Sequence, residues 1–103
     1  MKEVKAIIQP FKLDAVLNAL HHIGNLPVVV AGESQVIDTA RAMYQPVKMS
    51  KIELMVPDEL VEVVVGVIAQ AAHTGNPGDG RIFVIPIDES VVIRTGERGE
   101  EAR

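Results

Sequence analysis

Apolar and polar residues alternate in several short segments of the chain, and this two-residue period is typical of β-strands. In the first segment, residues 4–8, the side chains of Val4, Ala6 and Ile8 fall on one face. Pro10 follows and prevents further ladder pairing. The same reasoning predicts strands at residues 28–31, 51–56 and 81–85, and a short extended piece at 90–94.

Two longer segments carry apolar residues three or four positions apart, the spacing of a helix with one apolar side. The first helix is predicted over residues 14–22, ending near Gly24. The second is predicted over residues 60–72, with Asp58 before it in the position of an N-cap residue. Many apolar residues of the second helix are β-branched, so packing rather than propensity must stabilise it.

The predicted order of elements is βαββαβ. Two split βαβ units of this kind make a ferredoxin-like sandwich, an α+β fold with one antiparallel sheet and two helices on one face. We therefore expect a single domain over residues 1–103. The other face of the sheet has no cover within the chain, which favours oligomerisation into a closed cyclic assembly.

Two segments lack either period. Residues 32–49 have polar side chains scattered among single apolar ones, and Pro46 lies near their end. This stretch is predicted to be an exposed loop. Residues 97–103 are dominated by charge and are predicted to form a mobile C-terminal tail.

Composition narrows the classes of partner. The net charge of −4 and the scarcity of aromatic residues, 3% of the chain, argue against nucleic acid as a ligand. The absence of cysteine excludes disulfides, thiolate metal sites and cysteine nucleophiles. Residues 1–9 carry charges and lack the apolar run of a signal peptide or membrane span. We expect a cytoplasmic protein that does not insert into a membrane.

Candidate chemistry is concentrated in a Gly-rich turn, residues 74–81, between the second helix and the last strand. Gly75, Gly78 and Gly80 allow its backbone to approach a ligand, so that N–H groups can face phosphate oxygens. Glycines alone would also suit a plain connecting turn. Arg81 at the end of the turn, with Arg94 and Arg98 further along, adds guanidinium groups suited to phosphates. Together they indicate an anion site.

Four groups of residues carry a resemblance to a known family. They are Ala6-Ile7-Ile8 with Pro10-Phe11-Lys12-Leu13, Lys51-Ile52-Glu53 with Val56-Pro57-Asp58, Thr74-Gly75 with Gly78-Asp79-Gly80-Arg81-Ile82-Phe83-Val84, and Ile93-Arg94-Thr95-Gly96-Glu97-Arg98-Gly99-Glu100. In combination they resemble the PII signalling family over nearly the whole chain. The last two groups are the most specific.

The resemblance implies a homotrimeric regulator, not an enzyme, that binds adenine nucleotides between subunits and docks on a target protein through a T-loop. It assigns these residues to the nucleotide: Ile7, Val29, Glu53, Leu54, Met55, Gly78, Asp79, Gly80, Arg81, Arg94 and Arg98. It assigns these to the T-loop and its partner: Gln35, Asp38, Arg41, Tyr44 and Lys48. A membrane transporter is one class of target that it suggests.

Several positions depart from the family pattern. Arg81 replaces a lysine and keeps its charge, whereas Val92 replaces the first of two C-terminal arginines that reach a neighbour's nucleotide. Val29 replaces a threonine near the base. With one arginine missing, we expect ADP or AMP to bind at least as well as ATP.

The loop departs further. Family members that sense 2-oxoglutarate have a glycine- and glutamine-bearing opening and a lysine at the closing base of the loop. Here the opening reads Gln35-Val36-Ile37-Asp38-Thr39, and Met49 is in the lysine's place. Lys48 is one residue away, which on a strand turns a side chain to the other face. We expect weak or no 2-oxoglutarate binding.

Two other classes of protein are alternatives to the PII resemblance. A CutA-like trimer binding a divalent metal would use His21, His22 and His73, but adjacent helical residues such as His21 and His22 point about 100° apart. An acylphosphatase-like hydrolase would use Arg81 and Asn76. No serine, histidine and aspartate set recurs at suggestive positions, so we predict no catalytic residue, no metal site and no cofactor beyond a regulatory adenine nucleotide.

Overall fold

The computed structural model of the chain describes residues 1–24, 26–36 and 47–99. Its strands are β1 (Lys2–Ile8), β2 (Val28–Val36), β3 (Val47–Val56) and β4 (Gly80–Pro86). Its helices are α1 (Leu13–His21) and α2 (Val61–Ala72), preceded by the short 3₁₀ helices η1 (Pro10–Lys12) and η2 (Asp58–Leu60). The order βαββαβ predicted from the sequence is confirmed.

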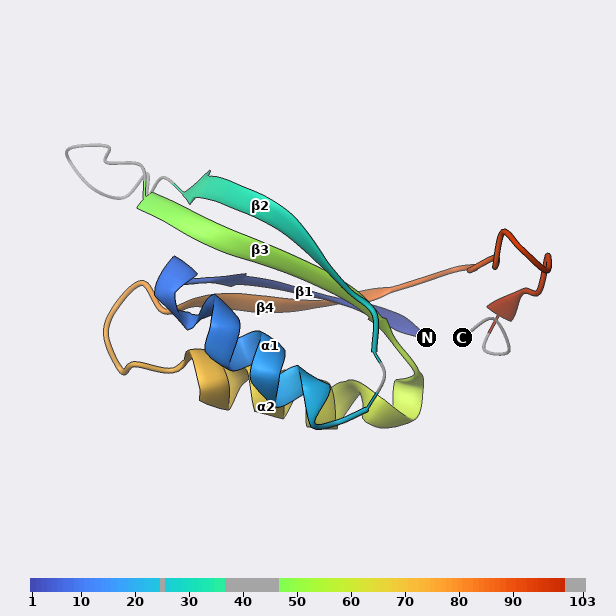
Figure 1. Cartoon of the computed structure of the whole chain (residues 1–103), viewed down its shortest axis with the longest axis horizontal. Helices are drawn as coiled ribbons and strands as arrows, with labels where there is room; N and C mark the ends of the chain where they lie inside the picture. Colours follow the sequence, from blue (N-terminus) through green and yellow to red (C-terminus); the bar gives the residue numbers. More distant parts are fainter. Residues whose placement is uncertain (25, 37–46, 100–103) are drawn as a thin grey trace.

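The strands form one sheet in the order β2-β3-β1-β4, and every neighbouring pair is antiparallel. Both helices cover the same face of this sheet, and no described helix or strand covers the other face in Figure 1. The fold is the expected ferredoxin-like sandwich. Within the described residues, no helix is long and apolar enough to cross a membrane.

The core lies between the sheet and its helices. Six alternate residues of β1 and β3 face the helices and are at most 1% exposed: Val4, Ala6, Ile8, Ile52, Leu54 and Val56. The helices contribute Val16, Leu20, Val64 and Ile68, each at most 2% exposed. Burying one such side chain stabilises the fold by about 1.5–3 kcal/mol. This packing compensates for the weak helix propensity of α2, as the sequence led us to expect.

The hairpin of β2 and β3 is longer than predicted. Residues 32–36 and 47–49 were assigned to an exposed loop, but they belong to β2 and β3, with Gln35 opposite Lys48 and Val36 opposite Val47. A register shift lies between Val30 and Glu33. Regular cross-strand pairing does not require strict apolar alternation, and so the pattern missed these ends. The rest of the predicted loop, residues 37–46, lies outside the described residues.

Asp58 does not cap the second helix as predicted. The N-cap residue of α2 is Leu60, and no side chain bonds there. The Asp58 carboxylate instead accepts a hydrogen bond of 2.6 Å from the Met1 amino group. This bond lowers the pKa of Asp58.

The segment after β4, residues 87–99, extends away from the sandwich in Figure 1 and is called the C-terminal arm here. The predicted extended piece is no strand of the sheet, because the arm folds back on itself through a bridge between Val91 and Arg98. Gly99 N donates to Ser90 O at 3.0 Å. Residues 97–99, predicted to begin a mobile tail, are therefore tied into the arm. The Ile93 side chain on this arm is 98% exposed.

Candidate functional site

The face of the sheet without helices, called the open face here, carries several of the side chains that the sequence singled out. Residues paired across antiparallel strands lie on the same face. Ile7 is paired with Lys51 on β3 and with Arg81 on β4. Glu53 is paired with Val29 on β2. The register alone thus places four predicted nucleotide residues on one surface.

Charged and apolar side chains are mixed on the open face. Lys51 Nζ lies 3.7 Å from Glu53 Oε1. Lys5 Nζ lies 3.9 Å from Glu3 Oε1. Around these pairs, four large apolar side chains are 36–60% exposed: Val29, Met55, Phe83 and Ile85. So much exposed apolar surface beside locally paired charges is typical of a surface that receives a partner.

One end of the open face is hollowed by a cavity of about 480 Å³. Its lining includes Val29, Glu53, Leu54 and Met55, together with Ser90 at the base of the arm. The structure thus brings together the four residues predicted to hold the adenosine part. The Leu54 side chain is 1% exposed and belongs to the core, so only its backbone can face a ligand.

The Gly-rich turn is organised by Asp79. Its Oδ2 accepts hydrogen bonds from the backbone N–H of Thr74, at 2.8 Å, and of Gly75, at 3.0 Å. The Thr74 hydroxyl donates to Oδ1. Thr74 Oγ1 in turn accepts a bond of 3.1 Å from Asn76 N. The Asp79 carboxylate is therefore directed into the turn, where it fixes the loop.

These bonds set the charge state of Asp79. The hydroxyl of Thr74, the N–H groups of Thr74 and Gly75, and His73, whose Nδ1 lies 3.8 Å from Oδ2, all favour the ionised form and lower the pKa of Asp79. An aspartate within a predicted phosphate site is unexpected, because it would repel the ligand. Its oxygens are instead occupied by donors of the turn.

Gly80 is required by close backbone contact. A Cβ at Gly80 would lie 1.9 Å from Ile7 O, and φ is +113°. Gly80 is paired with Ile8 across β1 and β4, so the turn enters the sheet directly beside the first strand. Arg81, the next residue, is exposed. The predicted phosphate residues Gly78, Asp79, Gly80 and Arg81 are thus held in one short, rigid stretch.

The C-terminal arm carries the other two predicted arginines. Arg98 Nη1 donates to Glu89 Oε1 within the arm, so its charge is already paired. Arg94 is exposed. Val92, which takes the place of an arginine, uses its backbone N–H to donate to Glu97 O at 2.9 Å. No pattern in the sequence predicted the pairing between Glu89 and Arg98.

The predicted site is not assembled within one chain. Gly80 is level with Ile8 and Met55 is level with Glu3, five residues apart on β1, which corresponds to about 17 Å at about 3.4 Å per residue. In Figure 1 the Gly-rich turn and the arm lie at opposite ends of the sandwich. The phosphate residues and the arginines of the arm therefore do not meet within a subunit.

The predicted T-loop residues are only partly placed. Gln35 and Lys48 are opposite each other on the β2–β3 hairpin, and both are exposed. Met49 is 4% exposed, so the residue in the lysine position of 2-oxoglutarate sensors is an apolar and buried side chain. Asp38, Arg41 and Tyr44 lie outside the described residues.

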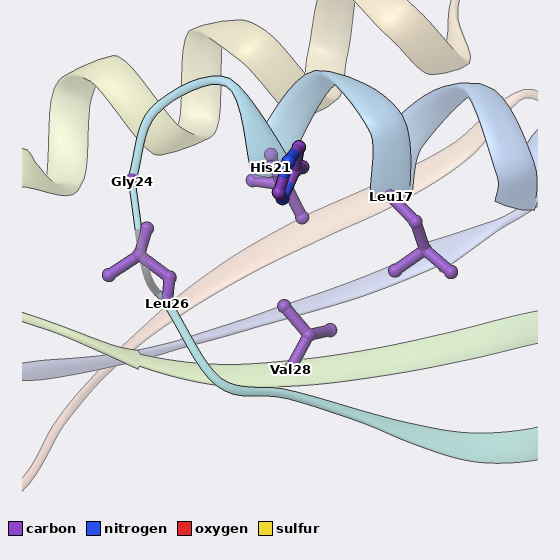
Figure 2. Close-up of a pocket in the computed structure, with 6 residues that line it drawn as sticks. Leu17, His21, Gly24, Leu26 and Val28 are labelled. Atoms are coloured by element: carbon purple, nitrogen blue, oxygen red, sulfur yellow. The ribbon is translucent and has the colours of Figure 1, made fainter.

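A second cavity, of about 620 Å³, lies between α1 and the start of β2. Figure 2 shows Leu17 and His21 projecting from α1 toward Leu26 and Val28. None of the predicted site residues lines it.

The histidines of the metal-binding alternative are spread over the fold. The rings of His21 and His22 have centroids 6.0 Å apart at an angle of 88°. His22 Nδ1 lies 2.8 Å from the carbonyl oxygen of Asn18. His73 lies beside the Gly-rich turn. Among the residues that the structure describes, no three histidine or carboxylate side chains gather as a metal site.

Gln9 was not singled out from the sequence. It follows β1, and its Nε2 donates a hydrogen bond of 2.5 Å to Gly78 O in the Gly-rich turn. Only the turn's position beside β1 in the folded chain could have revealed this contact.

Comparison with known proteins agrees with the fold and the motifs. The family model described as Nitrogen regulatory protein P-II matches residues 1–97. The chain is 43% identical to Nitrogen regulatory protein P-II of Azospirillum brasilense and 44% identical to that of Rhodospirillum rubrum, with 99% of each chain covered. These alignments run over 111 positions, so both relatives carry residues that this chain of 103 residues lacks.

Among solved structures, the crystal structure of Arabidopsis thaliana PII bound to citrate matches with a TM-score of 0.81 and 38% identity. The match covers 99% of this chain and 91% of that chain. The chain belongs to the Nitrogen regulatory protein P-II family of signal-transduction regulators.

Proposed function

We propose that this regulator binds adenine nucleotides in clefts between the subunits of a homotrimer and signals their occupancy to a target protein through residues 35–48, its T-loop. The observation that carries the proposal is the geometry of the Gly-rich turn. Its aspartate is directed inward, and residues 77–78 form a tight turn with φ of +91° at Gly78, so little side-chain bulk covers its backbone. Arg81 follows directly. Backbone donors beside a guanidinium group suit a phosphate.

The distribution of the site along the subunit supports a cleft between chains. Gly80 in the Gly-rich turn and Met55 at the cavity are about 17 Å apart along the sheet, so the two parts of the proposed site lie toward opposite ends of the open face. A neighbour on the open face would bring its own residues alongside. The protruding arm, with its exposed Ile93, would also gain cover from a neighbouring subunit. In a closed ring of three subunits, every subunit would make the same contacts, so each arm and each open face would be covered in the same way.

The arm sets the expected choice of nucleotide. Arg94 is exposed, Arg98 is paired with Glu89, and Val92 offers no side-chain donor. Few cations therefore remain for a third phosphate. We expect ADP or AMP to bind at least as well as ATP.

The hairpin supplies the route for the signal. Its strands remain paired as far as Val36 and Val47, with one register shift between Val30 and Glu33, so a change at its base would be passed along the paired strands toward the T-loop. Nucleotide occupancy would shift the population of T-loop conformations that the target recognises. A membrane transporter, or a protein that handles a small anion such as bicarbonate, is a candidate target. Met49 argues against 2-oxoglutarate as the second signal, because a thioether cannot pair with its carboxylates.

Calorimetric titration with AMP, ADP and ATP tests the proposal. ADP should bind with one site per subunit, and ATP should not bind more tightly than ADP. A tenfold preference for ATP would contradict the proposed role of Val92. Adding 2-oxoglutarate to the nucleotide complex should give no further heat of binding.

A further inference from the structure

Met55 is the most exposed methionine in the part of the chain that the structure describes. It lies on the open face of β3 and is 46% exposed. Met49, earlier on the same strand, is 4% exposed, and the side chain of Met1 is 9% exposed. Met43 lies outside the described residues. An oxidant must reach the sulfur of a thioether to react with it, so exposure distinguishes Met55 from Met1 and Met49.

Met55 also lines the cavity of about 480 Å³ at which the adenosine part is proposed to bind. The wall of this cavity is mostly apolar, with Val29 and Pro27 near one side of it. Among the described residues that line it, Glu53 and Ser90 have the polar side chains. A change in the polarity of Met55 would therefore act on the wall of the cavity itself.

Reaction with a peroxide changes the polarity of a thioether. The sulfur attacks one oxygen of hydrogen peroxide, and the O–O bond breaks as the S–O bond forms. The sulfur loses two electrons and becomes a sulfoxide. The second oxygen accepts those electrons and leaves as water with both protons. The methionine sulfoxide is polar, and reductases can convert it back to the thioether.

We infer that Met55 is an oxidation site through which peroxide lowers the affinity of the protein for nucleotide. The inference rests on the proposed nucleotide-binding function, and it adds a second chemical signal to the same site. A cleft that admits a nucleotide also admits the much smaller peroxide while it is empty. A bound nucleotide would cover the sulfur and protect it.

The test compares the wild type with Met55→Leu and with Met49→Leu, the matched control on the same strand. Leucine is apolar and close to methionine in size, but it has no sulfur to oxidise. Each protein is treated with hydrogen peroxide without nucleotide, and peptide mass spectrometry locates the added oxygen. ADP and adenosine are titrated before and after treatment. Each protein is compared with its own untreated form, which removes any effect of the substitution alone.

The expected result is a loss of affinity that depends on Met55. Met55 should gain an oxygen atom before Met49 does. In the wild type and in Met49→Leu, treatment should weaken ADP and adenosine binding by the same factor, about tenfold, because a polar group then lies in an apolar wall. Peroxide should not change the affinity of Met55→Leu. Methionine sulfoxide reductases of both stereospecificities should restore binding by the oxidised wild type, and ADP present during treatment should slow the oxidation of Met55.

Four results would overturn the inference. Met55 could stay unoxidised in the folded protein, or it could be oxidised without a change in ADP affinity. An equal loss in Met55→Leu would assign the effect to another residue. Dissociation of the oxidised wild type in sedimentation would show that oxidation acts on assembly instead. In all four cases the untreated wild type still binds ADP, so the proposed function survives. An untreated wild type that does not bind ADP would contradict the proposed function and this inference together.

Discussion

The two faces of the sheet use the same strands in opposite ways. On the face covered by helices, Leu54 and Ile52 are at most 1% exposed, and the core is complete within one chain. On the open face, the intervening residues Glu53 and Met55 lie among exposed apolar side chains and paired charges. Adjacent residues of β3 therefore serve different purposes: one set forms the core, and the other forms the exposed surface to which we assign the proposed ligand and neighbour.

The difference bears on the proposed site, which one small domain would not complete. Its Gly-rich turn and its C-terminal arm lie at opposite ends of the sandwich. In the proposed assembly, each neighbour would supply the missing part. Substitutions that disrupt one face of the sheet at a time therefore test this division of roles.

The largest expected effect comes from the covered face. Leu54→Ala should lower the free energy of unfolding by about 2–5 kcal/mol, since it leaves a cavity in the core. Met55→Ala, the next residue on the open face, should cost far less. Urea denaturation of both variants at one protein concentration measures the difference, because assembly makes stability depend on concentration. Equal losses would contradict the division between the faces.

A smaller effect on folding, but a large one on assembly, is expected on the open face. Phe83→Asp places a charge on the proposed interface, where it would be desolvated, and should shift the mass in sedimentation from trimer to monomer. Val63→Asp is the matched control, because Val63 is 50% exposed on α2, away from this face. A trimeric Phe83→Asp variant would place the interface elsewhere.

Within the site, Arg81 should contribute most to nucleotide affinity. Arg81→Ala removes a charged hydrogen-bond donor worth about 1.5–3 kcal/mol, so ADP affinity should fall about 10- to 100-fold in calorimetric titration. Arg81→Lys keeps the charge and should retain most of the affinity. Arg98→Ala should have little effect, since Arg98 is paired with Glu89. A larger loss from Arg98→Ala than from Arg81→Ala would reverse the proposed roles.

The smallest predicted effect is a pH dependence of the Gly-rich turn. Hydrogen bonds from Thr74 and Gly75 lower the pKa of Asp79 in the folded protein. Their stabilisation is thus fully present above the ordinary aspartate pKa of about 3.9, and it is lost as pH falls through the depressed value.

Asp79→Asn tests this pH dependence. At neutral pH the variant should melt at a lower temperature than the wild type, and the gap should narrow below about pH 4. Asp14→Asn, an exposed carboxylate on α1, is the control and should show no such gap. A gap for Asp79→Asn that stays constant with pH would contradict the role of the ionised carboxylate.

Much of the fold could be predicted from the sequence because local patterns determine it. Alternation at Val4, Ala6 and Ile8 indicated the strand, and the same residues form the core. The ends of β2 and β3 were missed because most of their residues are exposed and are held by cross-strand pairing, which requires no apolar alternation. The cap at Asp58 was wrong because the Met1 amino group, distant in sequence, binds that carboxylate.

Only the parts of the candidate site that carry a sequence motif could be predicted. The Gly-rich turn and Arg81 could be found from their residue types and spacing. The inward orientation of Asp79, the contact of Gln9 with Gly78 and the pairing of Arg98 with Glu89 depend on how side chains meet in the folded chain. Such contacts between positions far apart, or between a residue and its own loop, leave no periodic signal.

The central claim is that one nucleotide site uses the Gly-rich turn of one subunit and the arm of another, and subunit mixing tests it most directly. Arg81→Ala and Arg94→Ala proteins, each weak in ADP binding, are unfolded, mixed in equal amounts and refolded together. Random assembly should restore both arginines in about a quarter of the sites, and those sites should bind ADP with wild-type affinity. If the mixture binds no better than the separate variants, the two arginines do not share a site between subunits.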